Sequence, residues 1–333
     1  MPRAQDRIIR KIGQVTLTDG QRHTIDIPRD YDLEGLVVYF TGTSTLSVAG
    51  TAVRNEAPTQ AISFINVKAN GSDLLDGLTG TMAHRAGLIR RGQLYPLSAP
   101  SDATAAARTF SGGFILDRSV IDGIRAKDGA FPTNGLSTFQ VEIIAGNATD
   151  MFTGTPTGTM NMTVSVGVIQ LKEKAGADGK RSLPRVWTKR TQRTDAFASS
   201  NSAYEIVLNT GNILRGVLLR AYGASTAGEP SNTGLNNVKL QVGNEIVADL
   251  PAAMLQGIDA SSIDVSSVPT GYYLLDLMNM GAPATKLADG LDLRAGQVAK
   301  LILDVTGATN QKIDTSQWEY VPYNPSYWGI QTK

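Results

Sequence analysis

Positively charged side chains gather at the start of the chain and are the first candidates for a binding function. Residues 1–11 hold four cations and one acid, Asp6. Such a cluster suits an anionic lipid surface, where each basic residue contributes roughly 1 kcal/mol, or a contact with a neighbouring subunit. A solvated tail is the alternative. The four cations are Arg3, Arg7, Arg10 and Lys11.

A second basic group lies near the middle of the chain. Eight Lys and Arg residues fall between Lys172 and Arg193, against the acids Glu173 and Asp178. Basic residues beside an aromatic ring can bind single-stranded nucleic acid, but a linker or an interface strand explains the composition better. The residues predicted to contact a membrane or another subunit are Trp187, Lys189, Arg190 and Arg193.

Aromatic side chains are concentrated near the C-terminus. Five of them fall within eleven residues, separated by Pro322 and Pro325. The prolines exclude a regular helix or a central strand. Aromatic residues on a stiff extended tail can bury against a neighbouring subunit; folding back over the tail's own domain is the equal alternative. The five are Trp318, Tyr320, Tyr323, Tyr327 and Trp328.

Catalytic chemistry finds little support in the residue types. His23 and His84 are the only histidines and lie in unrelated contexts, so neither a histidine-based triad nor a metal site is predicted. The residues around Lys180 fail the phosphate-loop pattern. Asp117 and Asp276 follow apolar strand residues at matching places, which indicates a strand-end role and not an acid/base pair. We therefore predict no enzyme activity, no cofactor and no metal.

Composition limits the classes of protein further. The chain has 333 residues, 41% of them hydrophobic and 18% charged, with a net charge of +1 and no cysteine. The chain has enough hydrophobic residues for two cores. A protein that binds nucleic acid over its whole surface would have a higher positive net charge. Without an apolar signal segment or membrane span, the chain is expected to be soluble and made in the host cytoplasm.

One sequence pattern occurs twice and organises the rest. Residues 25–45 return as residues 206–226 at an offset of 181 without a gap. Later blocks keep their order at slightly smaller offsets, as expected if surface loops shortened after the duplication of one domain. The later pairs are Ile65–Lys68 with Val238–Gln241, Leu78 and Met82 with Leu250 and Met254, Phe114–Asp117 with Tyr273–Asp276, and Val141–Ile143 with Leu301–Leu303.

Strand signals dominate both copies. Apolar residues alternate with polar ones over 160–168 and 139–143, the period of a half-buried strand. A further strand over 65–69 runs into Asn70-Gly71, a strong turn signal. Helical spacing is brief: Leu75, Leu78 and Met82 predict one short helix, and Leu250 and Met254 predict its copy. The pattern predicts an all-β protein of two tandem eight-stranded jelly-roll sandwiches, with a short helix in each.

The boundary between the two copies falls in a charged, glycine-containing segment that ends at Pro184. The predicted parts are a basic N-terminal arm over 1–20, a first jelly roll over 21–182, and a second over 183–333 that includes the aromatic C-terminal tail.

With these blocks, above all 33–38 with 214–219 and Ile65–Met82 with Val238–Met254, the chain resembles the double jelly-roll major capsid proteins of non-tailed icosahedral viruses, the membrane-containing tectiviruses and corticoviruses in particular. The resemblance implies a homotrimer whose six jelly rolls form a pseudo-hexagonal capsomer of a virion shell. It also implies contacts with neighbouring capsomers, with other virion proteins such as a vertex protein, and with an internal lipid membrane.

Two other functions fit the same predicted fold, because jelly rolls serve many purposes. A tandem sandwich that binds a receptor or a carbohydrate, as a spike protein does, would carry an aromatic platform on a domain face. A jelly-roll hydrolase would need paired carboxylates in one cleft. The major capsid protein is the main prediction, the spike protein is its alternative, and self-assembly by burial of apolar surface is the expected mechanism.

Overall fold

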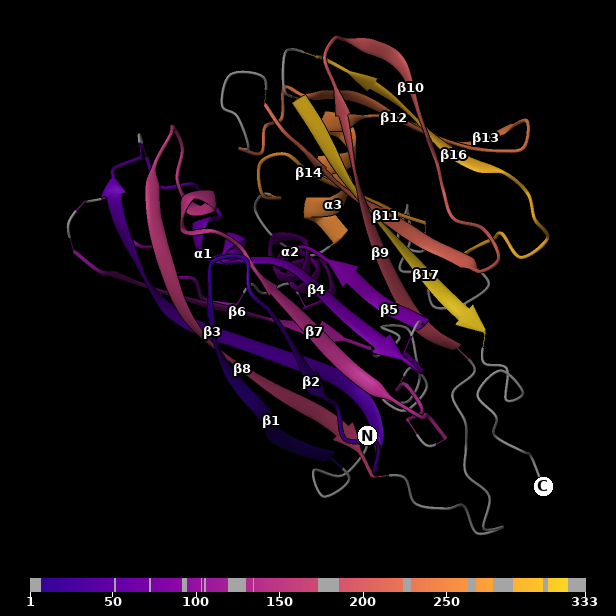
Figure 1. Cartoon of the computed structure of the whole chain (residues 1–333). Coiled ribbons are helices and arrows are strands. Elements are labelled where there is room, and N and C mark those ends of the chain that lie inside the picture. The colour runs from indigo at the N-terminus through magenta and orange to yellow at the C-terminus, as the bar shows by residue number, and fades with distance from the viewer. Residues whose placement is uncertain are drawn as a thin grey trace, which may run out of the picture. The chain divides into compact units, whose positions relative to one another are not determined.

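A computed structural model gives the fold of the chain (Figure 1). The residues that the structure describes are 7–50, 52–71, 73–91, 95–102, 104, 106–118, 130–133, 135–172, 186–223, 229–262, 268–277, 290–307 and 311–322. They divide into two compact units. Unit 1 comprises Met1–Lys189 and Pro322–Lys333, and unit 2 comprises Arg190–Val321. The predicted boundary at 182/183 lies outside the described residues.

The strands of unit 1 form two groups of four antiparallel neighbours. The first has the order β1-β8-β3-β6 and the second the order β2-β7-β4-β5 (Figure 1). The strands of the first sheet are β1 (Arg7–Thr18), β8 (Thr157–Leu171), β3 (Asp32–Val48) and β6 (Arg108–Asp117). Those of the second are β2 (Arg22–Asp26), β7 (Phe139–Ala145), β4 (Ile62–Ala69) and β5 (Asp73–Leu78).

Unit 2 repeats this arrangement. One of its sheets has the order β9-β17-β11-β14 and the other the order β10-β16-β12-β13. The strands of the first are β9 (Val186–Phe197, which contains the unit boundary), β17 (Gln311–Pro322), β11 (Ile213–Ala221) and β14 (Tyr272–Asp276), and the two-residue β15 (Leu291–Asp292) also pairs with β11. Those of the second are β10 (Asn201–Val207), β16 (Ala299–Val305), β12 (Leu235–Val242) and β13 (Glu245–Pro251).

The strand orders confirm the duplication that the sequence predicts. When the strands are numbered from the start of their own unit, β1-β8-β3-β6 and β9-β17-β11-β14 both have the order first, last, third, sixth. This order is the jelly-roll connection. The registers agree at single residues too. Gly35 lies opposite Asp117 as Gly216 lies opposite Asp276. Each unit is therefore one jelly roll, and the chain is an all-β double jelly roll.

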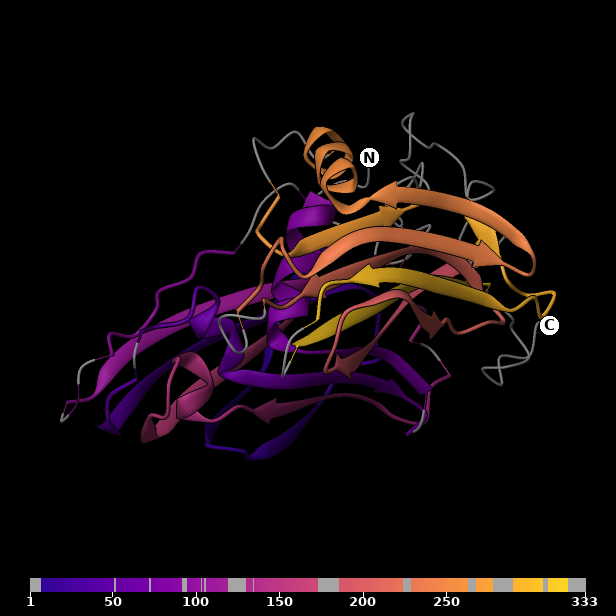
Figure 2. The same ribbon diagram turned by 90° about the horizontal axis from the view of Figure 1, so that it is seen from above.

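Helices fill only small parts of the two units. Unit 1 has α1 (Ala57–Gln60), α2 (Gly80–Arg91) and the 3-10 helix η3 (Ala148–Met151), and unit 2 has α3 (Ala252–Ser262), which is drawn as a coil beside its sheet in Figure 2. The predicted helical spacing was partly wrong. Leu75 and Leu78 belong to β5, and Leu250 belongs to β13. Helix α2 begins just after β5, and α3 begins just after β13. The apolar residues before each helix, such as Leu78 and Leu250, pair instead in the hairpins β4–β5 and β12–β13.

The turn predicted at Asn70-Gly71 joins β4 to β5. Asn70 has φ 50° and Gly71 has φ 81°, the left-handed values that a tight hairpin turn requires. The alternating segments are also strands, since 160–168 lies in β8 and 139–143 lies in β7.

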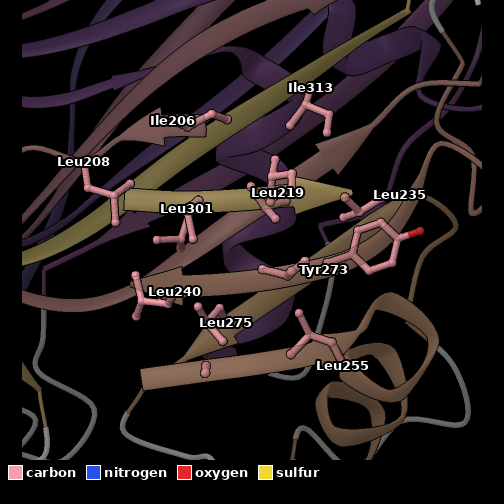
Figure 3. Packing of buried hydrophobic residues seen from close by; sticks show 14 of the residues in the cluster. Ile206, Leu208, Leu219, Leu235, Leu240, Leu255, Tyr273, Leu275, Leu301 and Ile313 are labelled. Carbon is pink, nitrogen blue, oxygen red and sulfur yellow. The ribbon is translucent and has the colours of Figure 1, made fainter. Parts of the chain in front are cut away.

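Apolar side chains from both sheets fill the interior of each jelly roll. In unit 2 the core takes residues from β10, β11, β12, β14, β16 and β17 and from α3 (Figure 3). Leu219, Leu240 and Leu301 are fully buried there. In unit 1 the matching inward positions on β3 are Leu36, Val38 and Phe40, all at 0% exposure. Burial of this apolar surface, at roughly 25 cal/mol per Å², is the main force that holds each sandwich together.

The N-terminal arm predicted over 1–20 is corrected by the structure. Residues Arg7–Thr18 form β1, which pairs along its length with β8 from Arg7 opposite Leu171 to Thr18 opposite Asn161. In β1, Val15 and Leu17 alternate with polar residues, as expected for a strand. The basic residues Arg7, Arg10 and Lys11 lie in the first half of the same strand. The segment is therefore an edge strand of unit 1.

Candidate assembly surfaces

The N-terminal cations lie on β1, and two of the three described ones have carboxylate partners. Arg7 binds Glu34 with its guanidinium, through Nε at 2.8 Å and through Nη2. Arg10 Nη2 lies 3.0 Å from Asp30 Oδ2 and 3.1 Å from Gln170 Oε1. Lys11 donates to the neutral side chain of Gln14. Arg3 lies outside the described residues.

An apolar patch lies on the outer face of the β1-β8-β3-β6 sheet. Ile9 stands opposite Ile169, and Ile169 stands opposite Gly35 on β3. In the next row of the same face, Val37 stands opposite Ile115 on β6. Ile9 is 72% exposed, and Ile169, Val37 and Ile115 are half-buried.

Tyr39 extends this face by one further row. Its side chain is 41% exposed, and its ring centroid lies 6.2 Å from that of Tyr95. We call Ile9, Val37, Tyr39, Ile115 and Ile169 the unit 1 patch. Large apolar side chains in consecutive cross-strand rows form a contiguous surface, which is typical of a protein contact site.

Beyond Tyr39 the same face becomes polar. Its rows contain Thr16, Thr163 and Thr41, followed by Thr18, Asn161 and Thr43. The outer face of this sheet thus has an apolar half and a hydroxyl-rich half, on four adjacent strands.

The equivalent outer face in unit 2 is buried. On β11 the inward residues Val217 and Leu219 belong to the core, so Leu218 and Arg220 point to the outer face. Leu218 is 1% exposed and Arg220 is 3% exposed, although their counterparts Val37 and Tyr39 are half-buried and exposed. The remaining residues of this covered face are Tyr272, Leu274, Asp314, Ser316 and Trp318, each at most 4% exposed.

Charged residues on the covered face are neutralised by close partners. Arg220 Nη1 lies 3.2 Å from Asp314 Oδ2, and Tyr222 donates its hydroxyl to the same oxygen at 2.5 Å. Thr194 donates to the other oxygen, Oδ1, at 2.6 Å. Buried charges require such partners, because desolvation of an unpaired ion costs several kcal/mol.

A second buried ion pair lies nearby on the same sheet. Arg215 Nη2 lies 3.3 Å from Asp276 Oδ2, and Arg215 Nη1 lies 3.1 Å from the Tyr320 hydroxyl. The guanidinium also lies 5.9 Å from the ring centroid of Trp318. Asp276 is the last residue of β14, as the predicted turn or strand-end role requires.

The predicted aromatic interface tail is corrected for the two residues that the structure describes. Trp318 and Tyr320 belong to β17 and are 2% and 0% exposed. Both side chains are buried within the folded chain, so their exposure gives no support to a contact with another subunit. The remaining three, Tyr323, Tyr327 and Trp328, lie outside the described residues.

The second basic group is also largely buried. Trp187 is 6% exposed and packs edge-on against Phe131, with ring centroids 5.4 Å apart, and Arg190 is 1% exposed. The burial of these two side chains gives no support to the predicted contact with a membrane or a partner. Lys189 is half-buried. Arg193 is exposed and forms an ion pair with Asp195.

The outer face of the β10-β16-β12-β13 sheet in unit 2 combines apolar and acidic side chains. One row across its four strands contains Val207, Lys300, Gln241 and Ile246. Val207 is 58% exposed and Ile246 is 53% exposed. Val247 and Val298, at 44% and 58%, lie at the same end.

The charges of this face include three acids and two lysines. Lys300 Nζ lies 2.7 Å from Glu205 Oε1, and Lys239 Nζ lies 3.2 Å from Asp249 Oδ2. Asp304, opposite Asn237, adds a third carboxylate. We call this surface the unit 2 outer sheet.

The matching sheet of unit 1 has a polar centre instead. The Glu142 carboxylate accepts from Asn66 Nδ2 at 2.9 Å and from Lys68 Nζ at 3.0 Å, and lies 3.2 Å from Arg22 Nε. Desolvation raises the pKa of Glu142, but the hydrogen bonds and the positive charges together outweigh it and lower the pKa. In unit 2 the apolar Ile302 takes this place, opposite Lys239.

Two titratable groups are buried away from these surfaces. His84 lies with Nε2 2.9 Å from the carbonyl oxygen of Tyr95, and burial lowers its pKa. Asp259 on α3 accepts a hydrogen bond from the Leu274 amide at 2.7 Å. Burial, aided by the negative charge of Asp276, raises the pKa of Asp259 to about 7.

The described part of the chain lacks two kinds of feature. No group of three or more histidine, cysteine, aspartate or glutamate residues there could hold a metal ion. Within the same residues, no helix is both long enough and apolar enough to cross a membrane.

Known proteins share this architecture without sharing much sequence. No protein-family model matches the chain, and no curated protein matches it by sequence. The STIV major capsid protein matches with a TM-score of 0.75 and 16% identity, covering 98% of this chain and 99% of that chain. The major capsid protein P2 of bacteriophage PM2 matches with a TM-score of 0.62 and 14% identity, covering 96% and 99%. The chain has the double jelly-roll fold of these capsid proteins. The PBCV-1 virus capsid protein agrees, with a TM-score of 0.61 and 16% identity over 96% of this chain and 95% of its own.

The unit 1 patch was missed in the sequence. A signal for it exists, since the run Leu36 to Phe40 is apolar at every position. A strand with one solvated face alternates, so a continuous apolar run indicates that both faces become covered. Sequence alone does not say what covers the second face.

Proposed function

We propose that the chain is the major capsid protein of an icosahedral virus and forms trimeric, pseudo-hexagonal capsomers. The observation that carries the proposal is the pair of jelly rolls with the same strand order in one chain. Capsid proteins with this architecture match nearly the full length of the chain and of their own chains. Three copies would supply six similar units, so that a threefold assembly presents near-sixfold edges to its neighbours.

The mechanism is self-assembly, with no catalytic step. Ile9, Val207 and Ile246 are more than half exposed, and their burial between subunits would supply the driving force. In this proposal the β1 cations contact protein and not lipid, because Arg7 and Arg10 already have carboxylate partners. Contacts with an internal membrane and with a vertex protein stay predictions.

The test is the mass of the purified protein by light scattering after size exclusion, with the same peak viewed by negative-stain microscopy. A stable particle of three times the 35.4 kDa chain mass with a hexagonal outline is expected. A monodisperse monomer over a wide concentration range would contradict the capsomer and would turn attention to glycan binding by a spike-like protein.

A further inference from the structure

Strand β14 is the last strand of its sheet, so one of its edges has no neighbour among the described strands of unit 2. Its other edge pairs with β11, where the Ala221 amide donates to the Gly271 carbonyl oxygen at 2.8 Å. Main-chain groups alternate between the two edges of a strand, so those of Tyr272 and Leu274 point away from β11. An open edge of this kind is a template for pairing with another chain.

Helix α3 closes this edge with two side chains. Gln256 Nε2 donates to the Tyr272 carbonyl oxygen at 3.0 Å, and Asp259 Oδ2 accepts from the Leu274 amide at 2.7 Å. The two side chains are three residues apart in the helix and therefore lie on the same face, and their targets are two residues apart in the strand. A carboxamide and a carboxyl thus take the places that the main chain of a neighbouring strand would take.

The matching strand of unit 1, β6, has its edge closed by main chain instead. The Ser98 amide donates to the Ser111 carbonyl oxygen at 2.8 Å, and the Ser111 amide donates to the Ser98 carbonyl oxygen at 3.0 Å. Main-chain amide pairs do not ionise. The duplicated units therefore close the edges of β6 and β14 by different means, and the closure of β14 depends on an ionisable group.

The apolar contacts of α3 are modest. The helix has eleven residues, Ala252–Ser262, a length at which isolated helices are marginal in water. In the part of α3 whose side chains are described, the buried apolar residues are Ala252 and Leu255, and Leu255 belongs to the core in Figure 3. Gly257 is exposed in the middle of the helix, where glycine weakens a helix about fivefold relative to alanine. Asp259 lies on the buried face, at a place that an apolar residue usually takes.

The surroundings of Asp259 oppose its ionisation. Burial and the like charge of Asp276 on β14 raise its pKa. The nearby cation, Arg215, already binds Asp276 at 3.3 Å. On β12 and β13, which also pack on α3, Lys239 and Asp249 pair with each other at 3.2 Å. The other titratable residues on the strands beside α3 are Glu245, Tyr272 and Tyr273.

We propose that α3 closes the β14 edge reversibly, and that ionisation of Asp259 releases the helix. In acid the carboxyl is uncharged and both side chains hold the strand. Above neutral pH a charged Asp259 would face Asp276 in a buried site, and release of the helix brings the carboxylate into water. The rest of the core comes from strands and stays folded. The inference is independent of the proposed capsid function, because it concerns one unit of a single copy.

Linkage gives the size of the effect. The pKa of Asp259 is about 7 in the closed state and takes its ordinary value of 3.8 once the helix is released. The folded pKa is the higher one, so closure is strongest in acid and weakens as the pH rises towards 7. The equilibrium constant for release should therefore rise roughly 90-fold between pH 5 and pH 8.

Hydrogen exchange of the full chain, followed by mass spectrometry at pH 5, 6, 7 and 8, measures this release. The rates are corrected for the intrinsic rate of exchange at each pH. Peptides over α3 and β14 are expected to lose protection roughly 90-fold over the range, while peptides over β16 keep theirs. D259N retains an oxygen acceptor for the Leu274 amide but cannot ionise, so its protection should stay constant.

Two further variants change how tightly the helix is held without altering the ionisable group. Q256A removes the hydrogen bond to Tyr272 and should raise release about threefold to tenfold at every pH. G257A places a Cβ where nothing lies within 4 Å and should lower release about fivefold at every pH. Both variants should keep the pH dependence of the wild type.

Each outcome decides for or against the proposal. Loss of protection confined to α3 and β14 and absent from D259N supports it. If D259N keeps the pH dependence of the wild type, ionisation of Asp259 does not release the helix. If β16 loses protection together with β14, unit 2 opens as a whole and α3 is no separate closure. Equal protection in G257A and the wild type would show that α3 is not the element released. The proposed capsid function stands in all of these cases, since trimer formation is measured separately.

Discussion

The buried carboxyl of Asp259 makes the stability of unit 2 depend on pH in a direction opposite to that of most surface acids. Asp259 is 5% exposed and its pKa is raised to about 7 from 3.8, mainly by burial. Below about pH 3 the carboxyl is protonated in both the folded and the unfolded chain. As the pH rises from about 3 to 7, the unfolded chain releases this proton while the folded chain keeps it. The free energy of unfolding therefore falls over this range, and the loss is complete above pH 7.

The size of the effect follows from the shift. About three pKa units at 1.36 kcal/mol each give an upper bound of about 4 kcal/mol, of which about 2.5 kcal/mol falls between pH 5 and pH 8. The variant D259N keeps an oxygen acceptor for the Leu274 amide but cannot ionise. We expect its free energy of unfolding to lack this decline.

Urea unfolding at pH 5, 6, 7 and 8, followed by circular dichroism, measures the difference between the wild type and D259N. The control is D249N. Hydrogen bonds from Asn237 and Lys239 lower the pKa of the exposed Asp249, so this residue titrates below the pH range of the experiment. Should the wild type and D259N show the same pH dependence within about 0.5 kcal/mol, against the shift of about 2.5 kcal/mol, Asp259 is ionised in the folded chain and the reasoning from burial fails.

Two further substitutions test the packing of unit 2. R220M removes the guanidinium that pairs with the buried carboxylate of Asp314 and should lower the free energy of unfolding by about 3–5 kcal/mol. In urea unfolding, the double variant R220M/D314L should recover much of this loss. No recovery would mean that lost packing causes the defect. G216A places a Cβ 2.6 Å from a backbone carbonyl oxygen, whereas the equivalent G35A places it at 3.4 Å. Thermal melting should therefore show a loss of about 1–3 kcal/mol for G216A and less for G35A, and equal losses would contradict the difference in spacing.

The duplication and the strand positions could be predicted from the sequence because they depend on local patterns. Alternation with a period of two marks β7 and β8, and the left-handed Asn70-Gly71 turn marks the β4–β5 hairpin. The matched blocks have the same register in both units, since Ile65 lies opposite Leu78 as Val238 lies opposite Leu250, although the spacing of Leu78 and Leu250 predicted helices there.

The candidate site could be predicted only in part, since exposure depends on what covers a strand. The pattern around Trp318 and Tyr320 predicts a partly apolar segment, but their burial depends on strands that lie far away in the sequence. An arginine is expected on the surface from its residue type, yet Arg190 is only 1% exposed. The basic segment over 7–18 was likewise assigned to an arm because its pairing partner, β8, lies about half the chain away.

The pairing of β1 with β8 also sets the order in which unit 1 can be completed during synthesis. Arg7 can pair with β8 only after its partner Leu171 has been synthesised. A ribosome working at 5–20 residues per second reaches Leu171 on the order of 10 to 30 s later. Throughout this interval Ile8, Ile9 and Ile12 are exposed on a nascent strand, a segment prone to aggregate. The interspersed Arg7, Arg10 and Lys11 and the bulge after Lys11 discourage premature pairing with other chains. The cations of β1 therefore protect the unfinished chain as well as pairing with carboxylates in the finished one.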